Sequence, residues 1–256
     1  MPQIVCYEQP LNERIRSLLR FEFLFEQIKQ GIHEPSLWAS RATLQGLFDL
    51  LTLTGRNEFK GDLLKELERH TTTLNRLRTN PQVHATALEH ILRDIGVAIQ
   101  NMRQLDTSAL EAVRQTDFLN AVYKRGQAPG GACQFDLPAL HHWLQQTTTV
   151  RATHLQQWLE PFTPLGDGVA LVLQLIRGSA TPQAEIAYRG FFQSTLDSNT
   201  PYQLLQVFLV NDVAVFPEIS SGRHRFTIRF LEQADPNQRA TQSAANIPFE
   251  LACCAL

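Results

Sequence analysis

Residues 169–189, Val-Ala-Leu-Val-Leu-Gln-Leu-Ile-Arg-Gly-Ser-Ala-Thr-Pro-Gln-Ala-Glu-Ile-Ala-Tyr-Arg, contain the change of pattern that decides the fold. The first five residues are apolar on nearly every side, which is typical of a buried helix, and the helix must end before Pro182. Beyond Pro182, Ile186 and Tyr188 alternate with other residues, and a period of two indicates strands. The composition thus changes near residue 180 from helices to strands.

The chain before this change carries apolar residues at helical spacing. Residues 11–30 are a predicted helix with a core side marked by Ile15, Leu18 and Ile28. Two later helices share a seam that advances by three and four residues, which predicts an antiparallel helical hairpin. The hairpin is either a protruding arm or dimer interface, or it packs within its own helical domain, which we favour. The seam consists of Leu63, Leu67, His70, Leu74 and Leu77, and of Leu88, Leu92, Ile95, Ile99 and Met102.

A second group of helical patterns surrounds a Pro-Gly-Gly turn. We expect one helix over residues 108–125, and then a tight turn in which the pair Gly130-Gly131 adopts positive backbone φ angles. Asp136 is the expected N-cap of the next helix, with Pro138 in its first turn. A further short helix holds Leu155, Trp158 and Leu159.

The C-terminal part reads as antiparallel strands. Strands at 203–210 and 213–216 flank Asn211-Asp212, a pair suited to a hairpin turn. In residues 223–230 the apolar Phe226, Ile228 and Phe230 face inward, while Arg225 and Arg229 face the other way. A lone strand cannot be stable by itself, so the N-terminal strand at residues 3–8 should join this sheet.

The predicted fold class is therefore α+β, with a mainly helical domain and an antiparallel β-domain formed by the C-terminal strands and the N-terminal strand. The expected limits are residues 10–180 for the helical domain, and 1–9 with 181–256 for the β-strand domain. On this division the helices are an insertion between the two ends of the β-domain.

Composition limits the classes of partner. The formal net charge of -2 predicts no bulk attraction to nucleic acid. The sequence has no signal peptide and no apolar run of about 18 residues, so we expect a cytoplasmic protein without a membrane segment. The spacing of the four cysteines, Cys6, Cys133, Cys253 and Cys254, matches neither a zinc site nor a redox motif, so we predict no metal and no other cofactor.

The segment after residue 128 offers the one catalytic alternative, a cysteine-dependent hydrolase built on Cys133 and His141. Such an enzyme needs a base within hydrogen-bond reach of the thiol and a group that orients the base. Asp136 could orient His141, but it is better used as a cap, and no oxyanion hole can be named. Adjacent His141 and His142 diverge by about 100° on a helix, which excludes a shared metal. We therefore predict no catalytic residues.

The basic residues form two candidate binding surfaces. Arg16 and Arg20 lie one turn apart on the first helix, and Arg20, next to Phe21 and Phe23, is expected to be partly desolvated and to bind a carboxylate strongly. The first surface adds Lys124, Arg125 and His141, and the second consists of Arg189, Arg223, Arg225 and Arg229 on the sheet.

Six segments spread over the chain have a characteristic order and spacing. They are Glu-Gln-Pro-Leu-Asn-Glu-Arg at 8–14, Arg-Phe-Glu-Phe-Leu at 20–24, Asp-Leu-Leu-Lys-Glu-Leu at 62–67, the Pro-Gly-Gly segment at 129–144, residues 225–230, and Phe-Glu-Leu-Ala-Cys-Cys at 249–254. No single segment is diagnostic of a family, but their order and spacing together are specific. By these segments the whole chain resembles the ZapD family of bacterial cell division proteins.

The resemblance implies a non-enzymatic homodimer that binds the acidic, apolar C-terminal tail of the tubulin-like protein FtsZ. By engaging two tails the dimer would cross-link filaments and stabilise the division ring at mid-cell. The family's basic pocket carries over to Arg20 and His141. This chain departs from the pattern at Asp117, where an arginine is expected, and Lys124 or Arg125 would then supply the missing charge.

Overall fold

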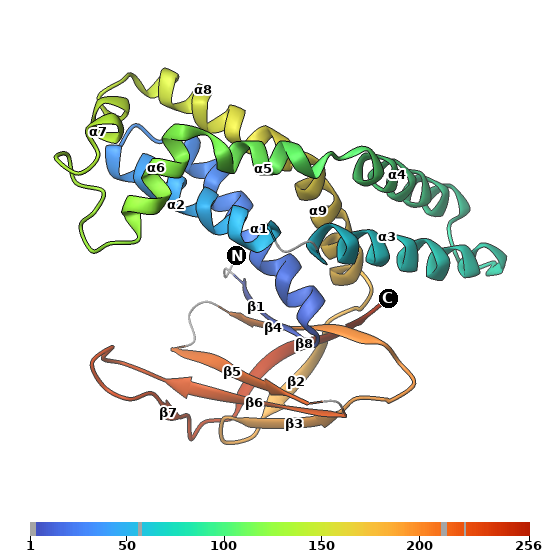
Figure 1. The fold of residues 1–256 in the computed structure, drawn as a ribbon. Helices are drawn as coiled ribbons and strands as arrows, with labels where there is room; N and C mark the ends of the chain where they lie inside the picture. The colour runs from blue at the N-terminus through green and yellow to red at the C-terminus, as the bar shows by residue number, and fades with distance from the viewer. Residues whose placement is uncertain (1–3, 56–57, 211–213, 223) are drawn as a thin grey trace. The chain divides into compact units, whose positions relative to one another are not determined.

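The computed structural model describes residues 4–55, 58–210, 214–222 and 224–256. Contacts divide the chain into two compact units, a sheet unit of Met1–Arg16 with Leu173–Leu256 and a helical unit of Ser17–Val172. The predicted α+β class is confirmed, and both chain ends contribute strands to the sheet unit (Figure 1). The expected domain limits, 10–180 for the helical domain and 1–9 with 181–256 for the β-strand domain, stay a prediction.

The helical part contains the following elements: α1 (Glu13–Ile32), α2 (Leu37–Thr54), α3 (Glu58–Arg76), a 3-10 turn (Leu77–Thr79), α4 (Ala85–Gln104), α5 (Thr107–Gln115), α6 (Asp117–Gly126), α7 (Pro138–Leu144), α8 (Thr148–Leu159), a second 3-10 turn (Glu160–Phe162) and α9 (Thr163–Arg177). Side-chain caps begin several helices. Ser36 accepts from the amide of Trp38 at the start of α2, and Asp106 accepts from Ser108 at the start of α5.

The predicted antiparallel hairpin is α3 and α4. Its seam residues Leu63, Leu67 and Ile95 are fully buried. The ion pair Arg103–Glu68 joins the last turn of α4 to the middle of α3. A Cβ added at Gly168 of α9 would lie 3.2 Å from the Leu63 side chain, so α9 packs closely against the start of α3. At that end the hairpin is packed within its own chain.

Two local predictions around the Pro-Gly-Gly turn are wrong. The expected helix over residues 108–125 is divided at Thr116, whose ψ of 123° is extended, so α5 and α6 are separate helices. Leu137, and not Asp136, is the N-cap of α7, because the Asp136 carboxylate instead accepts a hydrogen bond from the Cys133 thiol at 3.3 Å. Of the pair predicted to have positive φ, Gly130 does, with φ of 71°, and Gly131 does not.

A buried arginine joins the start of α2 to the loop between α7 and α8. Arg151 is 3% exposed and donates to the Ser40 hydroxyl at 3.0 Å and to the Leu144 carbonyl at 3.1 Å. It also donates to the carbonyls of Gln146 and Pro35, the latter at 2.7 Å. One side chain thus holds together segments that are about 110 residues apart in the chain.

The sheet unit contains two four-stranded antiparallel sheets. One has the order β1-β4-β8-β2 and the other β3-β6-β5, with β7 also paired to β6. The N-terminal strand pairs with β4 over its whole length, as predicted, from Ile4 opposite Val210 to Pro10 opposite Leu204 (Figure 1). The strands are β1 (Ile4–Pro10), β2 (Gln183–Ala187), β3 (Phe191–Thr195), β4 (Tyr202–Val210), β5 (Val215–Ser221), β6 (Arg225–Glu232), β7 (Thr241–Gln242) and β8 (Ile247–Ala255).

Side chains from both sheets form the core of the sheet unit. Phe226, Ile228 and Phe230 are buried there, as predicted, together with Leu205 and Phe249. The connection from β2 to β3 contains a two-residue turn between the bridged residues Tyr188 and Phe191. Both residues of this turn, Arg189 and Gly190, have positive φ. The expected turn at Asn211-Asp212 lies outside the described residues, but the hairpin prediction is wrong, because β4 and β5 belong to different sheets and do not pair with each other.

A partly buried polar cluster joins β1, β4 and the end of α9. The Arg177 guanidinium makes two hydrogen bonds of 2.8 Å to the Glu8 carboxylate, and Gln206 donates to the same carboxylate at 2.9 Å. Burial raises the pKa of the neighbouring Cys6 thiol to about 11, and Glu8 adds to this shift. Burial likewise raises the pKa of Cys254 to about 11.

Candidate functional site

The cations predicted on the helices are all found on helical surfaces. Arg16 and Arg20 lie on α1, Lys124 and Arg125 in the last turn of α6, and His141 in the last turn of α7. Arg16 bonds to Glu13 at 3.1 Å. Within the described ranges no hydrogen bond or ion pair joins these five side chains to one another.

The expected partial desolvation of Arg20 is wrong. Arg20 is exposed, whereas its neighbour Phe21 is fully buried and Phe23 is 69% exposed. Successive residues point about 100° apart on a helix, so apolar neighbours in sequence do not surround a side chain. Arg20 therefore offers a solvated charge.

The sheet arginines also face solvent. Arg225 and Arg229 are exposed on β6, on the side opposite to the buried Phe226, Ile228 and Phe230. Arg229 is ion-paired with Glu218 of the neighbouring strand β5, which reduces the charge it offers to a ligand. Arg189 occupies the β2–β3 turn, and Arg223 lies outside the described residues.

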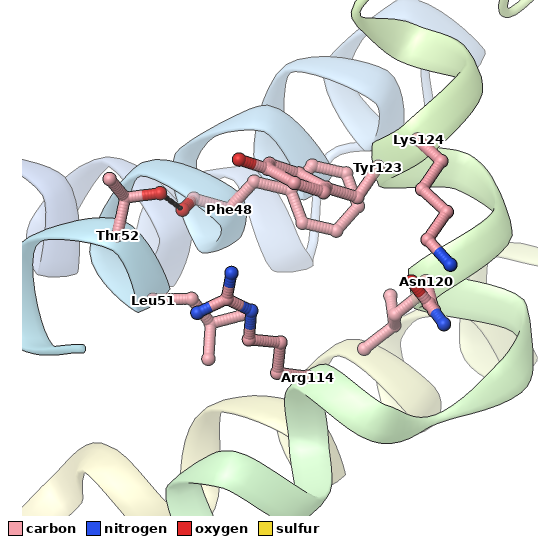
Figure 2. A pocket seen from close by; sticks show the side chains of 8 residues that line it. Phe48, Leu51, Thr52, Arg114, Asn120, Tyr123 and Lys124 are labelled. Carbon is pink, nitrogen blue, oxygen red and sulfur yellow. Dashed lines mark hydrogen bonds between the residues drawn. The ribbon is translucent and has the colours of Figure 1, made fainter.

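A groove between α2, α5 and α6 combines apolar and cationic side chains within the helical unit (Figure 2). Its cavity volume is about 120 Å³, and it is open to solvent. We call it the α2–α6 groove and define it by its lining residues, Phe48, Leu51, Thr52, Arg114, Leu119, Asn120, Tyr123 and Lys124. Of the predicted site residues, only Lys124 belongs to this lining.

The floor of the α2–α6 groove is apolar and fixed by packing. Leu119 is 1% exposed, and the Phe48 ring meets the Tyr123 ring edge-on with centroids 5.4 Å apart. Figure 2 shows the Arg114 guanidinium reaching from α5 toward α2, and the Lys124 ammonium beside Asn120. An apolar floor with charged groups at its margin suits a ligand that is itself apolar and acidic.

The charges of the groove are of one sign. Its lining contains Arg114 and Lys124 and no carboxylate. Among the residues that the structure describes, neither cation forms an ion pair or a side-chain hydrogen bond. The nearest acidic residues in sequence, Glu111 and Asp117, are exposed outside the lining, and Glu111 accepts a hydrogen bond from Gln115.

A second hollow adjoins the groove and shares Phe48 and Tyr123 with it. Its lining adds a third cation, Arg41, which donates to the Ala132 carbonyl at 3.0 Å and lies 5.5 Å from the Trp38 ring. Trp38 is 78% exposed at the start of α2. The cationic and apolar surface thus continues from α5 to the Pro-Gly-Gly turn.

The catalytic alternative has no supporting geometry. The Cys133 thiol is bonded to the Asp136 carboxylate, and no hydrogen bond to His141 is present in the described part of the chain. A carboxylate that accepts from the thiol leaves no positioned imidazole base. The described part of the chain contains no group of three or more histidine, cysteine or acidic side chains that could hold a metal ion. No described helix is long and apolar enough to span a bilayer.

The sequence contains a signal for this groove in a segment outside the predicted elements. Ser36 followed by Leu44, Leu47, Phe48 and Leu51 has the cap and the spacing of an amphipathic helix, and this is α2, one wall of the groove. Arg114 was missed because a single helix over 108–125 would place it about 15 Å from Lys124 along the axis. The break at Thr116 lets α5 and α6 line one groove.

Comparison with known proteins gives a consistent result over the whole chain. Residues 19–229 match the family model described as ZapD, cell division protein. A cell division protein ZapD of Nitrosomonas europaea is 37% identical over 253 residues, which cover 99% of this chain and 96% of the relative. That of Methylococcus capsulatus is 37% identical over the full length of both chains, and that of Coxiella burnetii is 36% identical over 98% of this chain and 97% of the relative.

Proposed function

The chain belongs to the ZapD family of cell division proteins, and from this premise we propose that it binds the acidic C-terminal tail of FtsZ through a basic surface. As a homodimer in the cytoplasm it would engage two tails, cross-link filaments and stabilise the division ring at mid-cell. The family is not an enzyme family, and the proposal includes no catalytic step.

The observation that carries this proposal is the presence of exposed cations beside apolar side chains on the helical unit of a chain with a net charge of -2. An acidic, apolar peptide is attracted by such a local surface even when the protein as a whole is nearly neutral. Carboxylates would be bound by the guanidinium and ammonium groups, and apolar residues by the hollows between helices.

The proposed contact residues fall on the two units. Those of the helical region are Arg16, Arg20, Lys124, Arg125 and His141, and those of the sheet unit are Arg225 and Arg229. Two copies of a weak tail site joined in a dimer raise the effective strength of each contact, because the second binding event becomes intramolecular. Weak single sites are therefore compatible with stable cross-links.

Fluorescence anisotropy of a labelled FtsZ tail peptide, titrated with the protein at low and moderate salt, tests the binding step. We expect saturable binding that weakens with salt and with Arg20→Glu. The matched control is Arg93→Glu, which makes the same charge change at an exposed position of α4. No saturation at about 100 μM protein, the range of weak complexes, would count against tail binding.

The cross-linking step needs its own measurement. Analytical ultracentrifugation is expected to show a dimer, and low-speed sedimentation of FtsZ filaments should increase with wild-type protein. Tail binding by a protein that sediments as a monomer at every concentration would retain the binding proposal and reject the cross-linking one.

A further inference from the structure

We propose that the α2–α6 groove is a binding site for an extended acidic peptide segment, with Arg114 as its principal carboxylate-binding residue. The proposal rests on the proposed function in one respect, namely that the segment comes from the FtsZ tail. It is distinct from that function because Arg114 and the groove lie outside the residues named above, Lys124 excepted.

The first support is the shape and chemistry of the floor. Phe48, Leu51 and Leu119 are buried side chains whose edges form an apolar surface already packed in place. The cavity volume of about 120 Å³ is smaller than the roughly 300 Å³ or more of clefts that hold a whole small ligand, so the groove accommodates one or two side chains of a peptide. A preformed site costs little ordering free energy when a ligand binds.

The second support is the state of the two cations. Arg114 and Lys124 flank the floor from α5 and α6, and within the described ranges neither is engaged by a protein carboxylate. A ligand carboxylate therefore displaces only water from them. The planar fork of Arg114 can bind a carboxylate through two parallel hydrogen bonds, whereas Lys124 offers a mobile point charge.

The third support is the continuation of the surface along α2. The adjoining hollow shares Phe48 and Tyr123 and brings in Arg41, so cations recur along a single apolar surface. Arg41 is already held by the Ala132 carbonyl and by the Trp38 ring, which fixes its guanidinium in position. An extended peptide with acidic residues separated by apolar ones matches this order of groups. A ligand that carries only negative charge would make no contact with the apolar floor.

The test compares wild-type protein, Arg114→Glu, Arg20→Glu and Arg93→Glu in anisotropy titrations of two labelled peptides. One peptide is the FtsZ tail, and the other is the same tail with its aspartates and glutamates replaced by asparagine and glutamine. Arg114→Glu is expected to weaken binding of the acidic tail about tenfold or more, because it removes a charge-assisted hydrogen bond and adds repulsion. It should leave binding of the amide peptide within about twofold of wild type.

The outcomes separate the two proposals. If Arg114→Glu binds the acidic tail as wild type does while Arg20→Glu loses binding, the groove proposal is overturned and tail binding through the other basic residues stands. If Arg114→Glu weakens both peptides equally, or no more than Arg93→Glu does, the specific role of Arg114 is also rejected. If wild type binds neither peptide, the proposed tail function fails, and this inference fails with it.

Because Arg114 is exposed, charge reversal there should not unfold the protein, and tryptophan fluorescence verifies this. All three tryptophans, Trp38, Trp143 and Trp158, belong to the helical unit. A second variant, Tyr123→Ala, removes part of the groove wall without changing charge and is expected to weaken both peptides. Wild-type affinity of Tyr123→Ala for both peptides would contradict the apolar half of the proposal.

Discussion

Replacing Arg151 by methionine should destabilise the helical unit substantially although no ion pair is broken. The side chain is 3% exposed and donates to four oxygen atoms at 3.1 Å or less, those of Pro35, Ser40, Leu144 and Gln146, and to the Thr148 hydroxyl at 3.5 Å. Methionine keeps much of the volume and none of the donors. The stability of the unit therefore depends on what those acceptors find in place of the guanidinium.

The magnitude follows from which acceptors water can reach. Ser40 and Leu144 are 2% exposed, so the hydroxyl of one and the carbonyl of the other lose their partner in a dry environment, at about 1–3 kcal/mol each. Pro35 and Gln146 are not buried and can be hydrated. Relief of the cost of burying the guanidinium offsets part of the loss, so we expect a net decrease of about 3 kcal/mol in the free energy of unfolding.

Urea denaturation followed by tryptophan fluorescence measures this quantity, because every tryptophan lies in the helical unit. Arg93→Met, an exposed arginine of α4, is the matched control and should change the free energy of unfolding by less than about 0.5 kcal/mol. A loss below about 1 kcal/mol for Arg151→Met would refute the reasoning, since it would mean that the four acceptors do not depend on this donor.

Three further predictions concern the sheet unit, and the last compares one of its glycines with a glycine of α4. Glu8→Gln removes the carboxylate that accepts two hydrogen bonds from Arg177 and one from Gln206 and should cost about 1–3 kcal/mol, seen as faster hydrogen exchange of β1 amides; unchanged exchange would contradict it. The raised pKa values of Cys6 and Cys254 mean that the folded state favours the neutral thiols, so their contribution to stability is complete below about pH 9 and is lost as the pH rises through about 11. Urea midpoints between pH 8 and 11.5 should therefore fall more steeply for wild type than for Cys6→Ala. Gly190→Ala, at φ +69° with its Cβ 2.5 Å from the Ser243 carbonyl oxygen, should cost about 2 kcal/mol or more, whereas Gly96→Ala in an open position of α4 should stabilise by about 0.5–1 kcal/mol; equal thermal unfolding of the two variants would be inconsistent with both.

The elements predicted correctly are those whose hydrophobic period is long and uninterrupted. The α3–α4 seam repeats over several turns, and from Arg225 to Phe230 the strand β6 alternates polar and apolar residues. The pairing of the N-terminal strand with the C-terminal strands followed from a physical requirement, since an isolated strand has no partner for its backbone groups. Such patterns depend on the residue sequence alone.

The errors arose where a tertiary contact competes with a local preference. Asp136 is a good capping residue, but the Cys133 thiol bonds to its carboxylate, and Pro138 begins α7 after Leu137 without a side-chain cap. The apolar residues of 108–125 change phase at Thr116: on one continuous helix Leu119 would lie about 180° from Leu110, and this shift marks a break that the predicted single helix ignored. The groove depends on this break and on α2, and neither was among the predicted elements.

The pairing of β1 with β4 has a consequence for the order of events during synthesis. Ile4 leaves the ribosome roughly 200 residues before Val210, its partner, which at 5–20 residues per second is a delay of about 10–40 s. In that interval the whole helical unit is translated, while β1 and the Cys6 thiol have none of their native sheet contacts. Until β4 has emerged, the nascent chain thus carries an unpaired strand edge, which is a site for chaperone capture or mispairing.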